Sequence, residues 1–237
     1  MVLLALLFSG IAIFLLQLNQ EEKDAPAPKK NDTSREDAVS EEEDTPEDLA
    51  RDSADAEKRQ KIYFLVLILV NIAAACFMRA MYQDTVLVIA NTLALLAVLW
   101  ACAWIDKKSF RIPNRILLLG LGMRLIFIAI EIIITPSEFR FVLLTSAIAA
   151  GVLLVTSLLC RLISPNAIGF GDVKLLALMG FFLRTDRILG AMIFSMLCAF
   201  LYSLYLVAFK KATRKTELAF APLLLVGTLL AVFLTTV

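Results

Sequence analysis

Two aspartates in a mostly apolar chain are the residues whose types and positions could support chemistry. Asp172 follows two glycines in the stretch AIGFGDVK, and Asp106 ends an apolar run that reads WACAWIDKK. Carboxylates are costly near a membrane and tend to be functional there. Two carboxylates that meet at one depth keep one shared proton near neutral pH, because close negative charges resist double ionisation. The ionised member can take a proton from water while the protonated member polarises a peptide carbonyl.

The composition excludes several other kinds of hydrolytic site. The chain has no histidine, which rules out Ser-His pairs, Cys-His pairs and histidine-based zinc sites. Its cysteines stand singly in apolar runs, and we interpret them as small buried hydrophobic residues: Cys76, Cys102, Cys160 and Cys198. A carboxylate pair needs no thiol and no imidazole. We therefore expect no metal and no other cofactor.

The elements that must position these aspartates are membrane helices. Hydrophobic residues make up 60% of the 237 positions, whereas soluble domains rarely exceed about half, so we predict an all-α polytopic membrane protein. About eight transmembrane helices are predicted, at 1–18, 62–80, 85–105, 115–134, 141–163, 173–183, 187–209 and 217–237. The run at 173–183 is shorter than the roughly 20 residues that a bilayer requires. We expect it to begin in the preceding loop and to lean on protein neighbours.

Charge divides the chain into three parts. Of the 22 acidic residues, 15 lie between positions 20 and 57, in a segment too poor in large apolar residues to order itself. We predict an N-terminal transmembrane helix over 1–18, an acidic disordered cytoplasmic linker over 19–61, and a membrane-embedded domain over 62–237. The first segment lacks a basic start and a cleavage site, so we expect it to be retained. An acidic docking tail is the alternative interpretation of the linker.

The basic residues predict the orientation. Clusters at 58–61, 107–115 and 210–215 fall on one side under the eight-helix count, and the positive-inside rule makes that side cytoplasmic. Two crossings separate Asp106 from Asp172, so both should lie at the cytoplasmic boundary. The membrane domain has five other acids, which fit the pair less well. Asp84 and Asp186 should lie near the opposite face, and Glu131 should snorkel or pair with an arginine. The remaining two are Glu138 and Glu217, of which Glu217 is on the predicted cytoplasmic side but has no glycine motif beside it.

The residues around Asp172 suggest why a loop lies there. Gly169 and Gly171 would let an extended peptide approach the backbone and would permit unusual φ/ψ angles. Pro165 and Asn166 should help to break the helix. Lys174 either biases the carboxylate pair or serves as a snorkelling anchor. Each aspartate also has a plainer reading: Asp172 as a helix N-cap after a turn, and Asp106 as a solvated interfacial acid.

Three blocks resemble the prepilin leader peptidases, the membrane aspartic peptidases of type IV pilus and type II secretion systems. GFGDVKLLALMG, from Gly169 to Gly180, is similar to that family's pattern G-x-G-D-x-K-L-L followed by small residues and glycine. IDKKSFRIPNRI places Asp106 seven residues before Pro113, which is followed by Asn114. FAPLLLVG resembles the family's F-G-P-x-L-x-x-G, with Ala221 in place of the usual glycine. We expect that last departure to leave the aspartate pair untouched.

The resemblance covers roughly residues 62–237 and implies a function. Asp106 and Asp172 would be catalytic, with Gly169, Gly171, Lys174, Pro113 and Asn114 as motif residues near the substrate. The activity implied is removal of the basic leader from prepilins or pseudopilins at the cytoplasmic face of the bacterial cytoplasmic membrane. Partners would be those substrates and membrane lipids, with no nucleic acid. Long members carry a cysteine-rich insertion and methylate the new N-terminus with S-adenosylmethionine; this chain has no paired cysteines, so we expect peptidase activity alone.

Other classes remain open at this point. Presenilin-like and signal-peptide-peptidase-like proteases also use GxGD, but their first aspartate follows a tyrosine, whereas Ile105 precedes Asp106 here. Archaeal preflagellin peptidases differ mainly in substrate. An ion-coupled transporter would use the acids as ion sites between broken helices. A membrane scaffold would tolerate Asp→Asn at both positions. The sequence indicates neither the particular pilin nor an oligomeric state.

Overall fold

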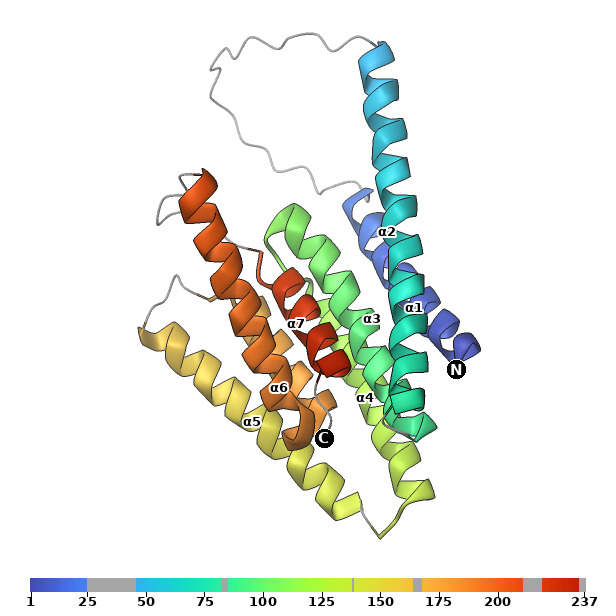
Figure 1. The fold of residues 1–237 in the computed structure, drawn as a ribbon, viewed down its shortest axis with the longest axis vertical. Coiled ribbons are helices and arrows are strands. Elements are labelled where there is room, and N and C mark those ends of the chain that lie inside the picture. Colours follow the sequence, from blue (N-terminus) through green and yellow to red (C-terminus); the bar gives the residue numbers. More distant parts are fainter. Residues whose placement is uncertain (25–45, 82–84, 138, 164–167, 211–218, 235–237) are drawn as a thin grey trace, which may run out of the picture.

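The computed structural model describes residues 1–24, 46–81, 85–137, 139–163, 168–210 and 219–234, and the regular structure within these ranges is helical (Figure 1). In chain order the helices are α1 (Val2–Asp24), α2 (Pro46–Met81), α3 (Val86–Ser109), α4 (Asn114–Ile134), α5 (Phe139–Ile163), α6 (Phe170–Lys210) and α7 (Ala221–Leu234). The predicted all-α class is therefore confirmed.

Each of the eight predicted apolar runs corresponds to a helical segment. The sixth and seventh runs form one long element, α6, which is interrupted at Arg184 by a non-helical conformation (φ 58°, ψ −173°). We call its first half α6a (residues 170–183) and its second half α6b (residues 185–210). Within the described ranges, five helices are long and apolar enough to cross a membrane: Gln60–Met81, Val86–Ser109, Asn114–Ile134, Phe139–Ile163 and Arg187–Ala208. The chain is thus a multi-pass membrane protein, and the count of about eight spans stays a prediction.

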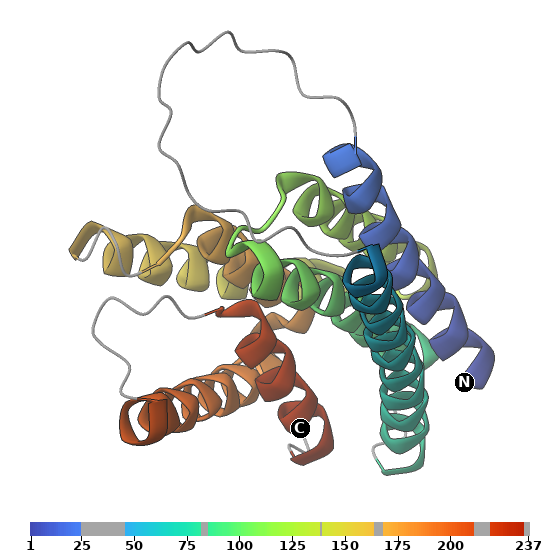
Figure 2. The ribbon, with the colours of Figure 1, turned by 90° about the horizontal axis from the view of Figure 1, so that it is seen from above.

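Helix α3 lies at the centre of the bundle. Its apolar window is 83% buried inside the protein, compared with 11% for the span in α6b, and it contacts α1, α2, α4, α6 and α7. Figure 2, which looks at the molecule from above, shows α3 in green surrounded by these helices. Asp106 therefore lies on the most enclosed helix of the fold.

Helix α1 packs on the bundle and is not only a tether for the linker. The buried side chain of Asn71 on α2 donates a hydrogen bond from Nδ2 to Ser9 Oγ at 3.0 Å, and Ser9 donates to the carbonyl of Ala5. Phe8 lies against Phe127 of α4 with ring centroids 6.2 Å apart. Interhelical polar contacts of this kind hold helices together where no water competes.

The predicted disordered linker is wrong at both ends. Helix α1 continues to Asp24 and α2 begins at Pro46, so the described parts of 19–61 are helical; residues 25–45 lie outside the described ranges. Proline at a first helical position is favourable, and the following residues are rich in Ala, Glu, Leu, Lys and Arg, which are good helix formers. Because the apolar span supplies the helix nucleus, extending it into this segment costs little. The division into three domains stays a prediction.

Helix α6a leans on its neighbours, as its short length predicted. Leu175, Met179 and Phe182 are buried. A Cβ atom added at Gly180 would come within 2.8 Å of the carbonyl oxygen of Ala149 on α5, so the glycine permits close helix contact. The turn at Arg184 lies in a region that costs about 1–3 kcal/mol for a residue other than glycine. The surrounding contacts must therefore impose it.

The cysteine prediction is correct for Cys102, which is buried. It is wrong for Cys76 and Cys160, which are exposed, while Cys198 is intermediate. An apolar run in a membrane protein also supplies the face that turns towards lipid, so the apolar context of a cysteine does not imply burial within the protein.

Candidate active site

Asp106 lies in the last turn of α3 and is only 5% exposed. The helix ends at Ser109 because Phe110 takes a left-handed conformation (φ 49°, ψ 29°) and donates its N–H to the carbonyl of Asp106 at 2.9 Å. This is a common way to end a helix. It directs the chain into the loop that leads to Pro113.

The N-terminus of α7 meets the Asp106 carboxylate. The backbone N–H of Ala221, the first residue of α7, donates to Asp106 Oδ2 at 3.0 Å. Helix N-termini present unpaired N–H groups and a positive partial charge, which favour a carboxylate. Position 221 therefore contacts the aspartate pair through its backbone N–H, which alanine and glycine both carry. This contact could not be predicted from the sequence, because a backbone donor leaves no mark in the residue type.

Asp172 lies in the first turn of α6a and is partly buried. The helix begins after Gly169, whose carbonyl accepts a hydrogen bond from the N–H of Val173 at 3.2 Å. The N–H of Gly169 in turn bonds to the Asp172 carboxylate. A carboxylate at the third helical position that reaches back to the N-cap N–H forms half of a capping box. The alternative interpretation of Asp172 as the N-cap itself is therefore wrong: Gly169 occupies that position, and Asp172 caps the helix start from its third residue.

The unusual φ/ψ angles predicted for the two glycines are not observed, and their role in the approach of a substrate stays a prediction. No described glycine has a positive φ angle. A Cβ at Gly169 would lie 3.1 Å from Asp172 Oδ2, and a Cβ at Gly171 would lie 2.9 Å from the Cβ of Ile112. Both glycines therefore allow the start of α6a to pack closely on the protein itself. They bring the backbone near the Asp172 carboxylate and near the loop after Asp106.

The structure places the two aspartates in the same cavity, whose volume is about 300 Å³. Its lining combines the end of α3, the following loop and the starts of α4 and α6a: Asp106, Phe110, Arg111, Ile112, Asn114, Gly169, Phe170, Gly171, Asp172 and Lys174. All the predicted site residues except Pro113 are among them. Pro113 instead precedes the first residue of α4 in an extended conformation (φ −71°, ψ 131°).

Burial and, after it, the nearby charge of Asp106 raise the pKa of Asp172 to about 6, against the opposing effect of the hydrogen bond from Gly169. Desolvation and a like charge both disfavour the ionised form of a carboxyl group. Asp172 therefore holds a proton at mildly acidic pH. This is the behaviour expected of one member of a carboxylate pair that shares a proton.

Lys174 connects the starts of two helices. Its Nζ donates to Asn114 Oδ1 at 2.8 Å, which joins α6a to the first residue of α4. Both residues also line a second cavity of about 610 Å³ between α4, α5 and α6a. The other lining residues of that cavity are Arg115 and apolar side chains: Leu117, Leu118, Leu121, Ala150, Leu154, Ala177, Leu178 and Phe181. The Asn114–Lys174 pair thus stands between a polar cavity and an apolar one.

Arg161 fixes the segment that leads into α6a and was not identified from the sequence. Its Nη1 donates to the carbonyl of Ile168 at 2.6 Å, and its guanidinium lies 3.6 Å from the ring centroid of Phe170. Such cation–π contacts stabilise by roughly 0.5–1 kcal/mol at exposed sites. The approach to Asp172 is therefore held at Ile168 and Phe170.

Glu131 pairs with an arginine, which is one of the two alternatives predicted for it. Its Oε1 lies 3.3 Å from Arg124 Nη1, and both side chains are buried. Several other predicted features fall on residues outside the described set: Asp84, Glu138, Pro165, Asn166, Glu217 and the side chain of Asp186.

A helical membrane bundle with two carboxylates in one cavity at a helix end defines a class of candidate membrane hydrolases. Residues 93–204 match the model of the type IV leader peptidase family, and this region contains both aspartates. The chain is also 33% identical over 126 residues to the prepilin leader peptidase/N-methyltransferase of Bacillus subtilis (strain 168), an alignment that covers 53% of this chain and 48% of the relative. No solved structure matches. The chain is therefore similar to the type IV leader peptidases over about half of its length.

The similarity has a defined extent. The chain spans about half the length of the curated relative it matches. Ala221, which donates to Asp106, lies beyond the region that the family model covers.

Proposed function

We propose that this protein is a membrane aspartic endopeptidase that removes the leader from prepilin-like or pseudopilin substrates. The observation that carries the proposal is the cavity shared by Asp106 and Asp172, which come from elements far apart in the sequence. The match to the type IV leader peptidase model and the prepilin leader peptidase activity in the relative's name support this substrate class.

In the proposed reaction one carboxyl group holds a proton and the other is ionised. The ionised group accepts a proton from water, whose oxygen attacks the scissile carbonyl, while the protonated group donates to the carbonyl oxygen. The C–N bond then breaks, and the amine that leaves takes a proton from the pair. The Ala221 N–H stabilises a charge on Asp106 while burial opposes that charge, so the pair shares one proton, which the raised pKa of Asp172 retains at mildly acidic pH.

The proposed site faces the cytoplasm. Lys107, Lys108 and Arg111 follow Asp106 directly, at the end of the bundle where the cavity lies. Basic residues next to a span favour the cytoplasmic side. A basic leader would remain in the aqueous phase there, and the adjoining apolar cavity offers a surface for the apolar helix that follows the scissile bond.

The test is co-expression with a type IV prepilin, followed by mass measurement of the N-terminus of the product. We expect cleavage by the wild-type chain and none by Asp106→Asn or Asp172→Asn, although both variants still insert into the membrane. Asp84→Asn is the matched control and should cleave normally. Full cleavage by either catalytic variant would overturn the proposed site. The same mass measurement reports methylation of the new amine, which we propose is absent.

A further inference from the structure

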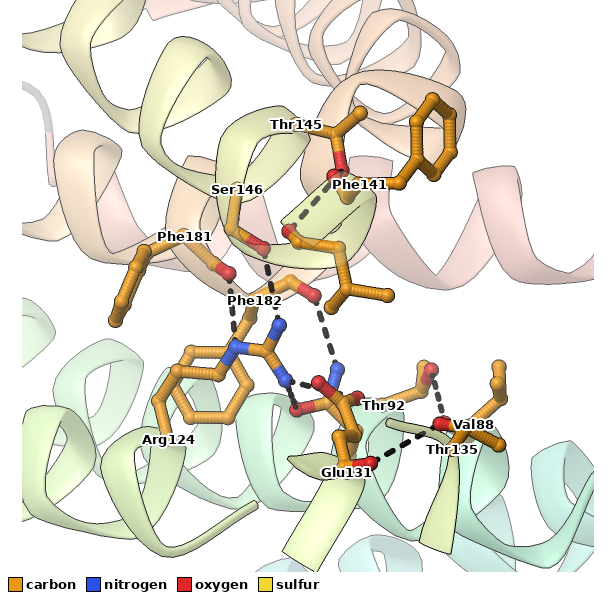
Figure 3. A network of polar contacts seen from close by, with 12 residues as sticks. Val88, Thr92, Arg124, Glu131, Thr135, Phe141, Thr145, Ser146, Phe181 and Phe182 are labelled. Carbon is orange, nitrogen blue, oxygen red and sulfur yellow. Dashed lines mark hydrogen bonds and ion pairs between the residues drawn. The ribbon is translucent and has the colours of Figure 1, made fainter. Parts of the chain in front are cut away.

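The end of α6a that lies away from Asp172 is held by buried polar side chains (Figure 3). The last carbonyls of a helix have no partner within the helix, and the break at Arg184 ends α6a inside the bundle. The carbonyl of Phe181 accepts from Arg124 Nε at 3.0 Å, and the carbonyl of Phe182 accepts from Asn91 Nδ2 at 2.9 Å. Side chains from α4 and α3 thus supply the donors that the interrupted helix lacks.

Arg124 connects four helices from a position with no solvent exposure. Besides its bond to α6a, Nη1 donates to Asn91 Oδ1 of α3 at 2.9 Å and to Glu131 Oε1 at 3.3 Å, and Nη2 donates to Ser146 Oγ of α5 at 3.0 Å. A guanidinium presents its donors in a rigid planar fork. The positions of α3, α5 and α6a relative to α4 are therefore set together by one side chain.

The same two helices meet at both ends. Asp106 of α3 and Asp172 of α6a share a cavity at one end, and Asn91 of α3 bonds to Phe182 of α6a at the other. A helix that slips by one residue moves by about 1.5 Å along its axis and turns each side chain by about 100°. A displacement of about 1 Å at a catalytic group can lower the rate by about 100-fold. The contact at Phe182 therefore opposes a movement to which the proposed reaction is sensitive.

We propose that Asn91, Arg124, Glu131 and Ser146 form a clamp that fixes the register of α6a on α3 and thereby positions Asp172 against Asp106. Arg124 and Asn91 are positioning residues, because they touch the helix that carries Asp172 and not the scissile bond. This inference rests on the proposed function. Among the residues that the structure describes, Glu131 Oε2 has no hydrogen-bond partner, so maximal hydrogen bonding alone does not account for the cluster. Polar clusters of this kind serve register in other helical assemblies.

The clamp has a consequence that can be measured without a substrate. The charged or titratable groups that face Asp172 are Asp106 and Cys102 on α3, Arg111 in the loop, and Lys174 on α6a itself. Asp106 is the negative neighbour that raises the pKa of Asp172. If α6a loses its register, the two carboxylates separate and Asp172 titrates at a lower pH.

The experiment compares Asn91→Ala with Asn71→Ala in the full chain. Asn71 is a matched control because it is also a buried asparagine that donates to another helix, but its partner is Ser9 of α1. For each variant we would measure thermal unfolding in detergent, kcat and KM on a prepilin, and the infrared titration of the Asp172 carboxyl, assigned by comparison with Asp172→Asn. Asn91→Ala should lower kcat by about tenfold with KM unchanged and lower the Asp172 midpoint, whereas Asn71→Ala should change only thermal stability.

Two further variants keep the test decisive. Ser146→Ala removes a single acceptor of Arg124 and should give a smaller change in the same direction if Asn91→Ala fails to fold. Loss of stability with an unchanged kcat and an unchanged midpoint in Asn91→Ala, or in Ser146→Ala where that variant replaces it, would overturn the clamp. Equal effects in Asn71→Ala would also overturn it. If the wild-type chain cleaves no prepilin, the proposed function fails, and the infrared titration still tests the clamp.

Discussion

The two ends of α6a meet the same membrane bundle in opposite ways. At its start, Asp172 faces a cavity of about 300 Å³ together with Asp106 and Lys174. At its end, the carbonyls of Phe181 and Phe182 are enclosed by Arg124 and Asn91. One end leaves space beside charged groups, and the other fills that space with donors.

This contrast separates two uses of polar residues in a membrane protein. Buried polar groups that are hydrogen-bonded hold elements in place, whereas those beside a cavity are available to a ligand. Both the Arg124 cluster and the Asp106 cavity contain charges that are costly in lipid. The Asp106 cavity has a volume of about 300 Å³, which can hold water. The following predictions test this difference, from the largest effect to the smallest.

Removing a carboxylate from the cavity at the start of α6a should stop catalysis without unfolding the protein. We expect Asp172→Asn and Asp106→Asn each to lower the rate of prepilin cleavage by between about 10² and 10⁴, since each removes a group that transfers a proton. Cleavage rates and thermal unfolding in detergent would be measured on the same samples. If the unfolding temperature fell together with the activity, the two aspartates would be stabilising the fold rather than serving catalysis.

Removing the charge of Arg124 at the end of α6a should lower the stability of the protein. Arg124→Leu leaves Glu131 as a buried charge without its partner, and such changes cost about 3–5 kcal/mol of unfolding free energy. The double variant Arg124→Leu/Glu131→Leu removes both charges and should recover part of that loss. Denaturant unfolding of the two variants provides the measurement. If the double variant were less stable than Arg124→Leu, an unpaired charge on Glu131 would not be the cause of the stability lost in the single variant.

The cleavage rate and the stability should also depend on pH through Asp172, at the start of α6a. The pKa of Asp172 is raised to about 6, so its proton is held below that pH and lost above it. The active pair needs one proton, and kcat/KM should fall about tenfold per pH unit above the pKa. Since the native carboxyl binds its proton more tightly than the unfolded one, its contribution to stability is present below about pH 4 and is lost as pH rises through 6. A cleavage rate that rises steadily from pH 5 to pH 8 would contradict this assignment.

Filling the apolar cavity beside the site should weaken substrate binding with little effect on the chemistry. Ala177 lines that cavity, and Ala177→Trp should raise KM for a prepilin several-fold while kcat stays nearly unchanged, which is the pattern for lost ground-state binding. Leu159→Trp is the control, because Leu159 is exposed on α5 and does not line the cavity. Similar KM values for the two variants would show that the apolar cavity does not bind the substrate.

Much of the fold was accessible from the sequence because apolar runs and basic clusters directly reflect the membrane. The positions of the helices and the meeting of Asp106 with Asp172 followed from counting crossings. The helical ends of the linker were missed because composition reports the lack of a core, while a helix can simply extend from a neighbouring span.

The site was predictable only where side chains mark it. The Ala221 N–H on Asp106 and the carbonyls of Phe181 and Phe182 are backbone groups, which every residue type carries. The need for a residue without a side chain at Gly171 was predicted. Its close contact with Ile112 was not, because that contact depends on how α6a crosses the loop. A pairing of Glu131 with an arginine could be foreseen, whereas the attachment of Arg124 to a broken helix could not.

The hydrogen bond from Ala221 to Asp106 has a consequence for biosynthesis. The ribosome makes position 106 long before position 221, so during translation the carboxylate exists without its backbone donor. Only after α7 has been made can this acid acquire the partner seen in the fold. A nascent chain that stops before α7 therefore carries both acids, and the first of them lacks its backbone donor.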